Sequence, residues 1–136
     1  AYLANHYSKK IVILDCDFEA PGFTNYFLDE PSQSKDHNGI VEYFIDKEFI
    51  GSELSIQDYI WEVSKDYSGD GAIFIMPAGN LSDEIINDAS VLNTHKKQYL
   101  EGLGRLDTSN KKILEKKFSD LLDEIEEFIS PDLTLN

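Results

Sequence analysis

Two short runs of apolar residues stand out from the polar and apolar pattern of the chain. Residues 11–14 read I-V-I-L and residues 72–76 read A-I-F-I-M, and no polar residue interrupts either run. A continuous apolar run of four or five residues is typical of a strand that is buried on both faces, as in a parallel sheet. The pattern therefore predicts two buried strands, at about residues 11–15 and 72–76.

Helical spacing marks the segments around these runs. Shorter helices are predicted for residues 2–10, around residues 40–45, and from Ser55 to Val63, where a capping-box-like sequence begins. Residues 66–71 are predicted to form a turn, and residues 23–28 and 81–106 include further helical patterns. The clearest helix runs from Ser109 to Ile129. Its apolar positions recur every three or four residues and are Ile113, Leu114, Phe118, Leu121, Leu122, Ile125, Phe128 and Ile129. Its lysines come first and its acids last, the reverse of what the helix dipole favours.

The order of these segments predicts the fold class. Strand runs separated by helical segments indicate an α/β fold with right-handed crossovers. Two strands make a small sheet for 136 residues. We therefore expect residues 1–136 to form a single partial domain, an incomplete parallel sheet with flanking helices in a Rossmann-like three-layer arrangement.

Composition and charge narrow the function classes. Apolar residues make up 41% and charged residues 28% of the chain, as in globular proteins. No window approaches the ~20 apolar residues of a membrane span, so no transmembrane segment is expected. The net charge of −14 argues against binding to nucleic acid or anionic membranes, which requires clustered Lys and Arg. Cys16, the single cysteine, fits a reducing cytoplasm and is expected to be a small buried side chain.

Candidate chemistry follows the two predicted strands. Ligands of open parallel sheets bind beyond the carboxyl ends of the strands, where this chain has Asp15 and Asp17 after one strand and residues 77–80 (P-A-G-N) after the other. Two acids spaced by one residue point the same way while a strand continues. They would suit a Mg²⁺ ion held partly through water, or the orientation of an attacking water. The alternative is that both side chains shape the loop by accepting hydrogen bonds from backbone amides.

A longer string around these acids resembles a known family. Residues 12–22 read V-I-L-D-C-D-F-E-A-P-G, which resembles the strand and switch I of ParA/MinD-type P-loop ATPases, one subgroup of which reads D-x-D-x-E-A-P-G. Residues 2–10 resemble the helix after the phosphate loop of that family, and residues 73–80 resemble its next strand with a P-A-G end. Residues 99–107 resemble a stretch between switch I and Walker B. The resemblance covers most of the chain.

The resemblance implies a P-loop NTPase-like fold and an ATPase that uses Mg²⁺ and ATP. Asp17 corresponds to the aspartate that positions the hydrolytic water, and Asp15 to an acid that contacts Mg²⁺ through water. The switch segment that senses the γ-phosphate would comprise Glu19, Ala20, Pro21 and Gly22. Members of the family commonly form homodimers on binding ATP, and we expect a further, unidentified protein partner. The acidic composition makes a DNA-partition role less expected for this member.

Two motifs of that family are missing from the chain. It contains no K-G-G-x-G-K-S/T phosphate loop (Walker A), and it stops at residues 130–136, about where the strand that ends in the Walker B aspartate should begin. We therefore interpret the chain as the segment between the two motifs and expect it to be inactive alone. The strands that should flank residues 11–14 are expected to be absent, which would leave an open sheet edge.

Two other functions remain open. In a haloacid-dehalogenase-like phosphatase, Asp15 would be the nucleophile and Asp17 the general acid/base, with Mg²⁺ between them. That motif requires Thr or Val where this chain has Glu19. The other alternative is a non-catalytic interaction domain, a relic of a P-loop fold that uses the charged face of residues 109–129 as its partner surface.

Overall fold

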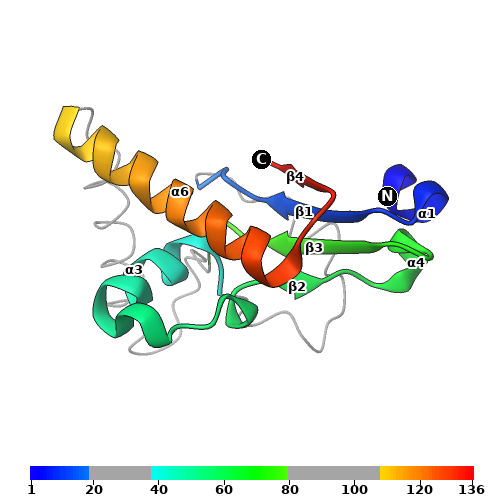
Figure 1. Cartoon of the computed structure of the whole chain (residues 1–136), viewed down its shortest axis with the longest axis horizontal. Coiled ribbons are helices and arrows are strands. Elements are labelled where there is room, and N and C mark those ends of the chain that lie inside the picture. Colours follow the sequence, from blue (N-terminus) through cyan, green and yellow to red (C-terminus); the bar gives the residue numbers. More distant parts are fainter. Residues whose placement is uncertain (19–37, 80–107) are drawn as a thin grey trace, which may run out of the picture.

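The computed structural model of the chain describes residues 1–18, 38–79 and 108–136 (Figure 1). Helices and strands alternate along these residues, which confirms an α/β fold. The helices are α1 (Tyr2–Tyr7), α3 (Ile40–Ile50), α4 (Lys65–Ser68) and α6 (Thr108–Ile129), with single 3-10 turns at η1 (Gly51–Glu53) and η2 (Ile56–Asp58). The strands are β1 (Lys10–Leu14), β2 (Trp61–Glu62), β3 (Ala72–Met76) and β4 (Leu133–Leu135).

β1 is an interior strand of the sheet, whose described strands have the order β2-β3-β1-β4. β1 pairs in parallel with β3 and with β4, and β2 is antiparallel to β3. The two predicted strands are confirmed as β1 and β3. The expectation that no strands flank β1 is wrong, because the last residues of the chain form β4. The edge strand β2 is only two residues long, and such a short edge offers little backbone for pairing with other chains.

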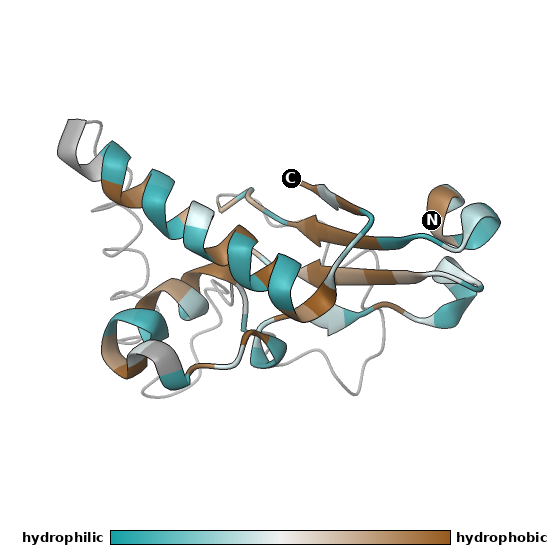
Figure 2. Ribbon diagram, in the orientation of Figure 1, coloured by the Kyte–Doolittle hydropathy of each residue, from teal (hydrophilic) through white to brown (hydrophobic). Residues whose placement is uncertain are grey.

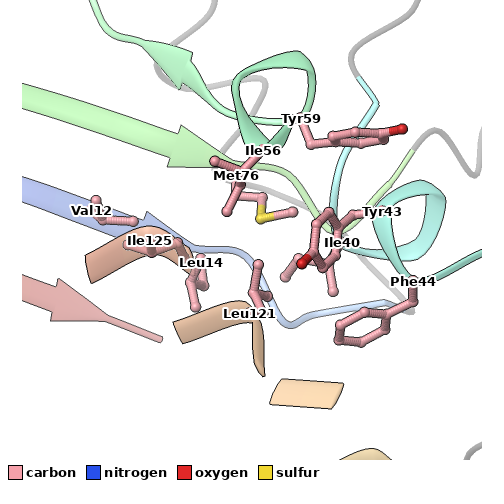
Figure 3. Packing of buried hydrophobic residues seen from close by; sticks show 10 residues of the cluster. All are labelled: Val12, Leu14, Ile40, Tyr43, Phe44, Ile56, Tyr59, Met76, Leu121 and Ile125. Carbon is pink, nitrogen blue, oxygen red and sulfur yellow. The ribbon is translucent and has the colours of Figure 1, made fainter. Parts of the chain in front are cut away.

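Hydrophobic residues fill both faces of the sheet. On one face, β1 and β3 pack against α3, η2 and α6 to form the larger core (Figure 3), which comprises Val12, Leu14, Ile40, Tyr43, Phe44, Ile56, Tyr59, Met76, Leu121 and Ile125. On the other face, a smaller core comprises Ala4, Ile11, Val63, Ile73 and Ile75. Alternate residues of β1 and β3 thus enter different cores, which explains why both strands read as uninterrupted apolar runs.

α6 runs across the sheet on the side of the larger core (Figure 1). Leu121 and Ile125 of this helix are fully buried, while hydrophilic residues occupy much of its length (Figure 2). The predicted helix of residues 109–129 is confirmed. No helix in the described parts of the chain is long and apolar enough to cross a membrane.

The end of α6 is joined to the start of β1 by a cluster of polar contacts. Lys10 Nζ donates to the carbonyl oxygen of Ile129 at 2.8 Å, which satisfies a carbonyl at the end of the helix. The backbone N–H of Lys10 donates to Asp132 Oδ2 at 2.8 Å, and Lys9 Nζ lies 2.8 Å from Asp132 Oδ1. These contacts fix β4 beside β1.

The segment from Ser55 to Val63 does not form the predicted helix. Only the single turn η2 forms after Ser55, and β2 then pairs with β3. Ile56 and Tyr59 pack in the larger core, whereas Val63 packs in the smaller core on the other face of the sheet. The helix-like spacing therefore arises because the chain crosses the sheet edge and supplies apolar residues to both faces.

Two predicted boundaries also differ. α1 ends at Tyr7 rather than Lys10, because Ser8 adopts a left-handed conformation with φ 50° and ends the helix. The predicted turn at residues 66–71 overlaps α4, a single helical turn that begins at Lys65. The helical patterns of residues 23–28 and 81–106 lie outside the described residues.

Candidate functional site

The candidate site lies at the carboxyl ends of β1 and β3, which are neighbouring parallel strands. Leu14 and Met76 are register partners, and the backbone N–H of Asp15 donates to the carbonyl oxygen of Met76 at 3.0 Å. The acids after β1 and the Pro-Ala-Gly loop after β3 (residues 77–79, here the β3 loop) therefore start at the same sheet edge. This arrangement is what the sequence predicts for a ligand site of a parallel sheet.

Asp15 and Asp17 have different environments. β1 ends at Leu14, so the strand alternation that would point both carboxylates the same way does not reach them. Asp15 is 1% exposed, whereas Asp17 is exposed. The backbone N–H of Asp17 donates to Asp15 Oδ1 at 3.1 Å, the bond by which an aspartate shapes a turn two residues on. Asp15 thus makes the hydrogen bond that the loop-shaping alternative requires, and of the two acids Asp17 is the exposed one.

The first turn of α3 docks against the β3 loop. The backbone N–H of Ile40 donates to the Pro77 carbonyl at 2.8 Å, and that of Val41 donates to the Ala78 carbonyl at 3.1 Å. The first N–H groups of a helix have no partner within the helix, so the loop carbonyls satisfy two of them. Gly39 permits this approach, because a Cβ atom there would lie 2.0 Å from the Pro77 oxygen.

Glu42 is a buried carboxylate beside the site that the sequence analysis did not identify. It is 5% exposed, and its Oε2 accepts a hydrogen bond from the Gly39 N–H at 2.9 Å. A Cβ atom on Gly79 would lie 2.9 Å from the same oxygen, so the β3 loop also approaches it. A glutamate in the first helical turn that bonds back to the residue before the helix is half of a capping box. A Ser or Thr before the helix would have indicated this motif in the sequence, but the chain has Gly39 there.

Cys16 lies between the two acids but has no features of a nucleophile. It is half-buried and packs against the larger core. Burial raises the pKa of its thiol above the ordinary value, and the Asp15 carboxylate raises it further. A thiol with a raised pKa stays protonated and unreactive. The expectation of a small buried side chain is met only in part, because Cys16 is half-buried.

The acids at this sheet edge have the right chemistry for a magnesium ion bound through water. Carboxylate oxygens are ligands that Mg²⁺ prefers, and Mg²⁺ commonly keeps several of its waters. Asp15 is buried and its Oδ1 accepts the Asp17 N–H, so of the two acids Asp17 is the one that is open to solvent. In the described part of the chain, no group of three or more His, Cys, Asp or Glu side chains is arranged to hold a metal ion.

Comparisons with known proteins found no relative. No protein-family model matches the chain, and no curated protein or solved structure matches it.

The predicted switch segment lies outside the described residues and consists of Glu19, Ala20, Pro21 and Gly22. The candidate site therefore consists of the two acids after β1, the β3 loop and the first turn of α3.

Proposed function

We propose that the chain is the segment between Walker A and Walker B of a Mg²⁺-dependent ATPase of the ParA/MinD type, and that it carries switch I. The observation that supports this most is the position of Asp15 and Asp17, which follow an interior strand with a parallel strand on each side. The resemblance places such an acid pair at the start of switch I and a Pro-Ala-Gly end on the next strand. In this chain the two motifs follow neighbouring parallel strands, and the Asp15 N–H donates to the carbonyl oxygen of Met76, the last residue of β3.

The two acids would have separate tasks in this proposal. Asp17 is exposed and would orient the water that attacks the γ-phosphate. Asp15 is buried, and its hydrogen bond to the Asp17 N–H fixes the backbone from which Asp17 projects. When bound, Mg²⁺ would neutralise charge on the phosphates. The resemblance gives Asp15 a contact with Mg²⁺ through water, which would require this buried carboxylate to become accessible.

The chain alone is not expected to hydrolyse ATP. It has no K-G-G-x-G-K-S/T string, which would supply the amides that cradle the phosphates and the lysines that pair with them. Dimerisation on binding ATP, a further protein partner and a cytoplasmic location belong to the same proposal, and their support is the resemblance.

The geometry gives less support to a haloacid-dehalogenase-like phosphatase. In that mechanism Asp15 must reach a phosphorus atom, but Asp15 is 1% exposed and holds the Asp17 N–H. The non-catalytic alternative differs in its response to ligand, because a relic that no longer binds nucleotide would not be stabilised by Mg²⁺ and ATP.

The first test is to sequence the coding DNA about 40 codons upstream of Ala1 and beyond Asn136. The proposal requires a K-G-G-x-G-K-S/T string upstream and an apolar strand that ends in Asp downstream. A start codon directly before Ala1 and a stop codon after Asn136 would refute the ATPase assignment and favour the non-catalytic alternative.

The second test is Asp17→Ala in the protein that carries both motifs. We expect this variant to bind ATP but to hydrolyse it at least roughly tenfold more slowly, which corresponds to ~1.4 kcal/mol of activation free energy. Asp70→Ala is the matched control, because Asp70 is an exposed acid at the opposite end of β3. Unchanged turnover of the Asp17 variant would remove this residue from the mechanism.

A further inference from the structure

The outward side of α6 carries a charge pattern that the core and the proposed ATPase site do not use. Its residues follow one another at alternating spacings of four and three, which places them on one side of a helix. We call this stripe the charged face, and it comprises Lys112, Lys116, Ser119, Asp123 and Glu126. All of these residues are exposed, on the side of α6 away from the larger core.

The charges on this face are segregated along the helix, with both lysines in its first half and both acids in its second half. Of these charges, only Glu126 lies in the last turn, where an acid opposes the helix dipole. Among the described residues, no ion pair involves Lys112, Asp123 or Glu126. Lys116 contacts Asp120 one turn away at 2.8 Å, yet its side chain is still 74% exposed.

We propose that the charged face binds the charged face of a second copy of this chain, with the two α6 helices antiparallel. About a two-fold axis beside Ser119, Lys112 lies opposite Glu126 of the second copy and Lys116 lies opposite Asp123 of the second copy. Symmetry produces each contact twice. The antiparallel arrangement also places each helix end beside the opposite end of the other dipole. Ser119 is small and allows the helices to approach at the axis.

This association is weak and does not require nucleotide. Its ion pairs are exposed to solvent, where each contributes little, and two chains of net charge −14 repel one another. The contact therefore belongs to the class of transient interfaces rather than stable dimers. It differs from the ATP-dependent dimer of the proposed function, because it forms through α6 without nucleotide.

Charge-swap variants test the proposal by sedimentation equilibrium of the whole chain at low ionic strength. We expect Lys112→Glu/Lys116→Glu alone, and Asp123→Lys/Glu126→Lys alone, to self-associate at least about tenfold more weakly than the wild type. An equimolar mixture of the two should form one-to-one heterodimers. The variant with all four changes keeps the net charge of −14 and the complementary pattern, so it should associate as the wild type does.

Three results would overturn the proposal: a double variant that associates like the wild type, a mixture that forms no heterodimer, or a wild-type chain that stays monomeric. The last result would leave the charged face to a partner of different sequence. The fourfold variant separates a specific pairing from general repulsion, because its net charge is unchanged.

Cross-linking provides a second measurement that does not change any charge. In a Cys16→Ser background, Ser119→Cys places two thiols beside the axis, and an added copper–phenanthroline oxidant should convert them to a disulfide-linked dimer. Gln57→Cys is the control, because Gln57 is exposed on η2 rather than on α6. Cross-linking of the Ser119 variant that is no faster than that of the Gln57 variant would contradict the antiparallel pairing.

Discussion

Gly39→Ala is expected to disrupt the docking of α3 at the candidate site. A Cβ atom there would lie 2.0 Å from the Pro77 oxygen and 2.7 Å from its carbonyl carbon, well inside normal contact distance. The φ of Gly39 is −143°, outside the left-handed region that favours glycine, so the expected loss comes from the contact with Pro77 rather than from a positive φ. The start of the helix or the β3 loop must therefore move by roughly 1 Å or more.

The magnitude follows from the hydrogen bonds that this movement affects. Losing the two bonds from the first helical N–H groups to the β3 loop costs about 1–3 kcal/mol, at ~0.5–1.5 kcal/mol for each. Displacing the Gly39 N–H from the buried Glu42 carboxylate costs about 1–3 kcal/mol more. The usual gain from replacing Gly by Ala, about 0.4–1 kcal/mol, has the opposite sign and is smaller. We expect the free energy of unfolding to fall by about 2–4 kcal/mol.

Urea unfolding followed by circular dichroism measures this loss, and amide hydrogen exchange locates it. We expect faster exchange at Ile40 and Val41, whose N–H groups bind the β3 loop. Gly51→Ala is the control: nothing lies within 4 Å of a Cβ atom there, and only its φ of +74° is strained. The control should be destabilised without a change in exchange at Ile40 and Val41. A Gly39→Ala protein with wild-type stability and unchanged exchange would refute the close packing described above.

Three further predictions concern stability. Ile125→Ala should lower the free energy of unfolding by about 2–5 kcal/mol, because Ile125 is 1% exposed. Leu122→Ala should lower it much less, because Leu122 is 43% exposed. The urea midpoints of the two variants test this difference. The hydrogen bond from Lys9 lowers the pKa of Asp132 below 3.8, so Asp132 stabilises the fold above that pH and less as the pH falls through its folded-state pKa. Asp132→Asn should therefore lower the urea midpoint at pH 7, and the difference from the wild type should shrink as the pH falls below 3.8. Equal midpoints at pH 7 would contradict this. Burial, and next a hydrogen bond to the Asp46 carboxylate on α3, raise the pKa of the Tyr59 hydroxyl above 10. The neutral Tyr59 therefore stabilises the fold below pH 10, and this stabilisation is lost at higher pH. A pH titration followed by absorbance at 295 nm should show one tyrosine fewer with a raised pKa in Tyr59→Phe than in the wild type.

The elements that the sequence predicts correctly have strong local patterns. β1 and β3 are runs of apolar residues rich in β-branched side chains, and both faces of each strand are buried. The apolar positions of α6 recur every three or four residues over so long a segment that only a helix fits them. β4 has no such signal, because three residues cannot establish a period, and it is a strand only because it pairs with β1. β2 was predicted as helix because its neighbours Ile56 and Val63 have helical spacing, although they enter different cores.

The candidate site was predicted in position but not in detail. The rule for parallel sheets brings Asp15 and Asp17 to the same edge as the β3 loop, and the structure agrees. The difference in burial between the two acids depends on where β1 ends, which their spacing does not determine. Glu42 was missed because tertiary packing, rather than the strand motif, brings α3 to this edge.

The pairing of β1 with β4 has a consequence for synthesis of the protein. Lys10 and Asp132, which are hydrogen-bonded, are 122 residues apart in the chain. A ribosome adding ~5–20 residues per second needs about 6–24 s to make that length. During this time β1 can pair with β3 but lacks its second neighbour, so a hydrophobic strand waits with one edge open to other chains. Slower translation or a shortage of chaperones should therefore lower the share of nascent protein that escapes aggregation.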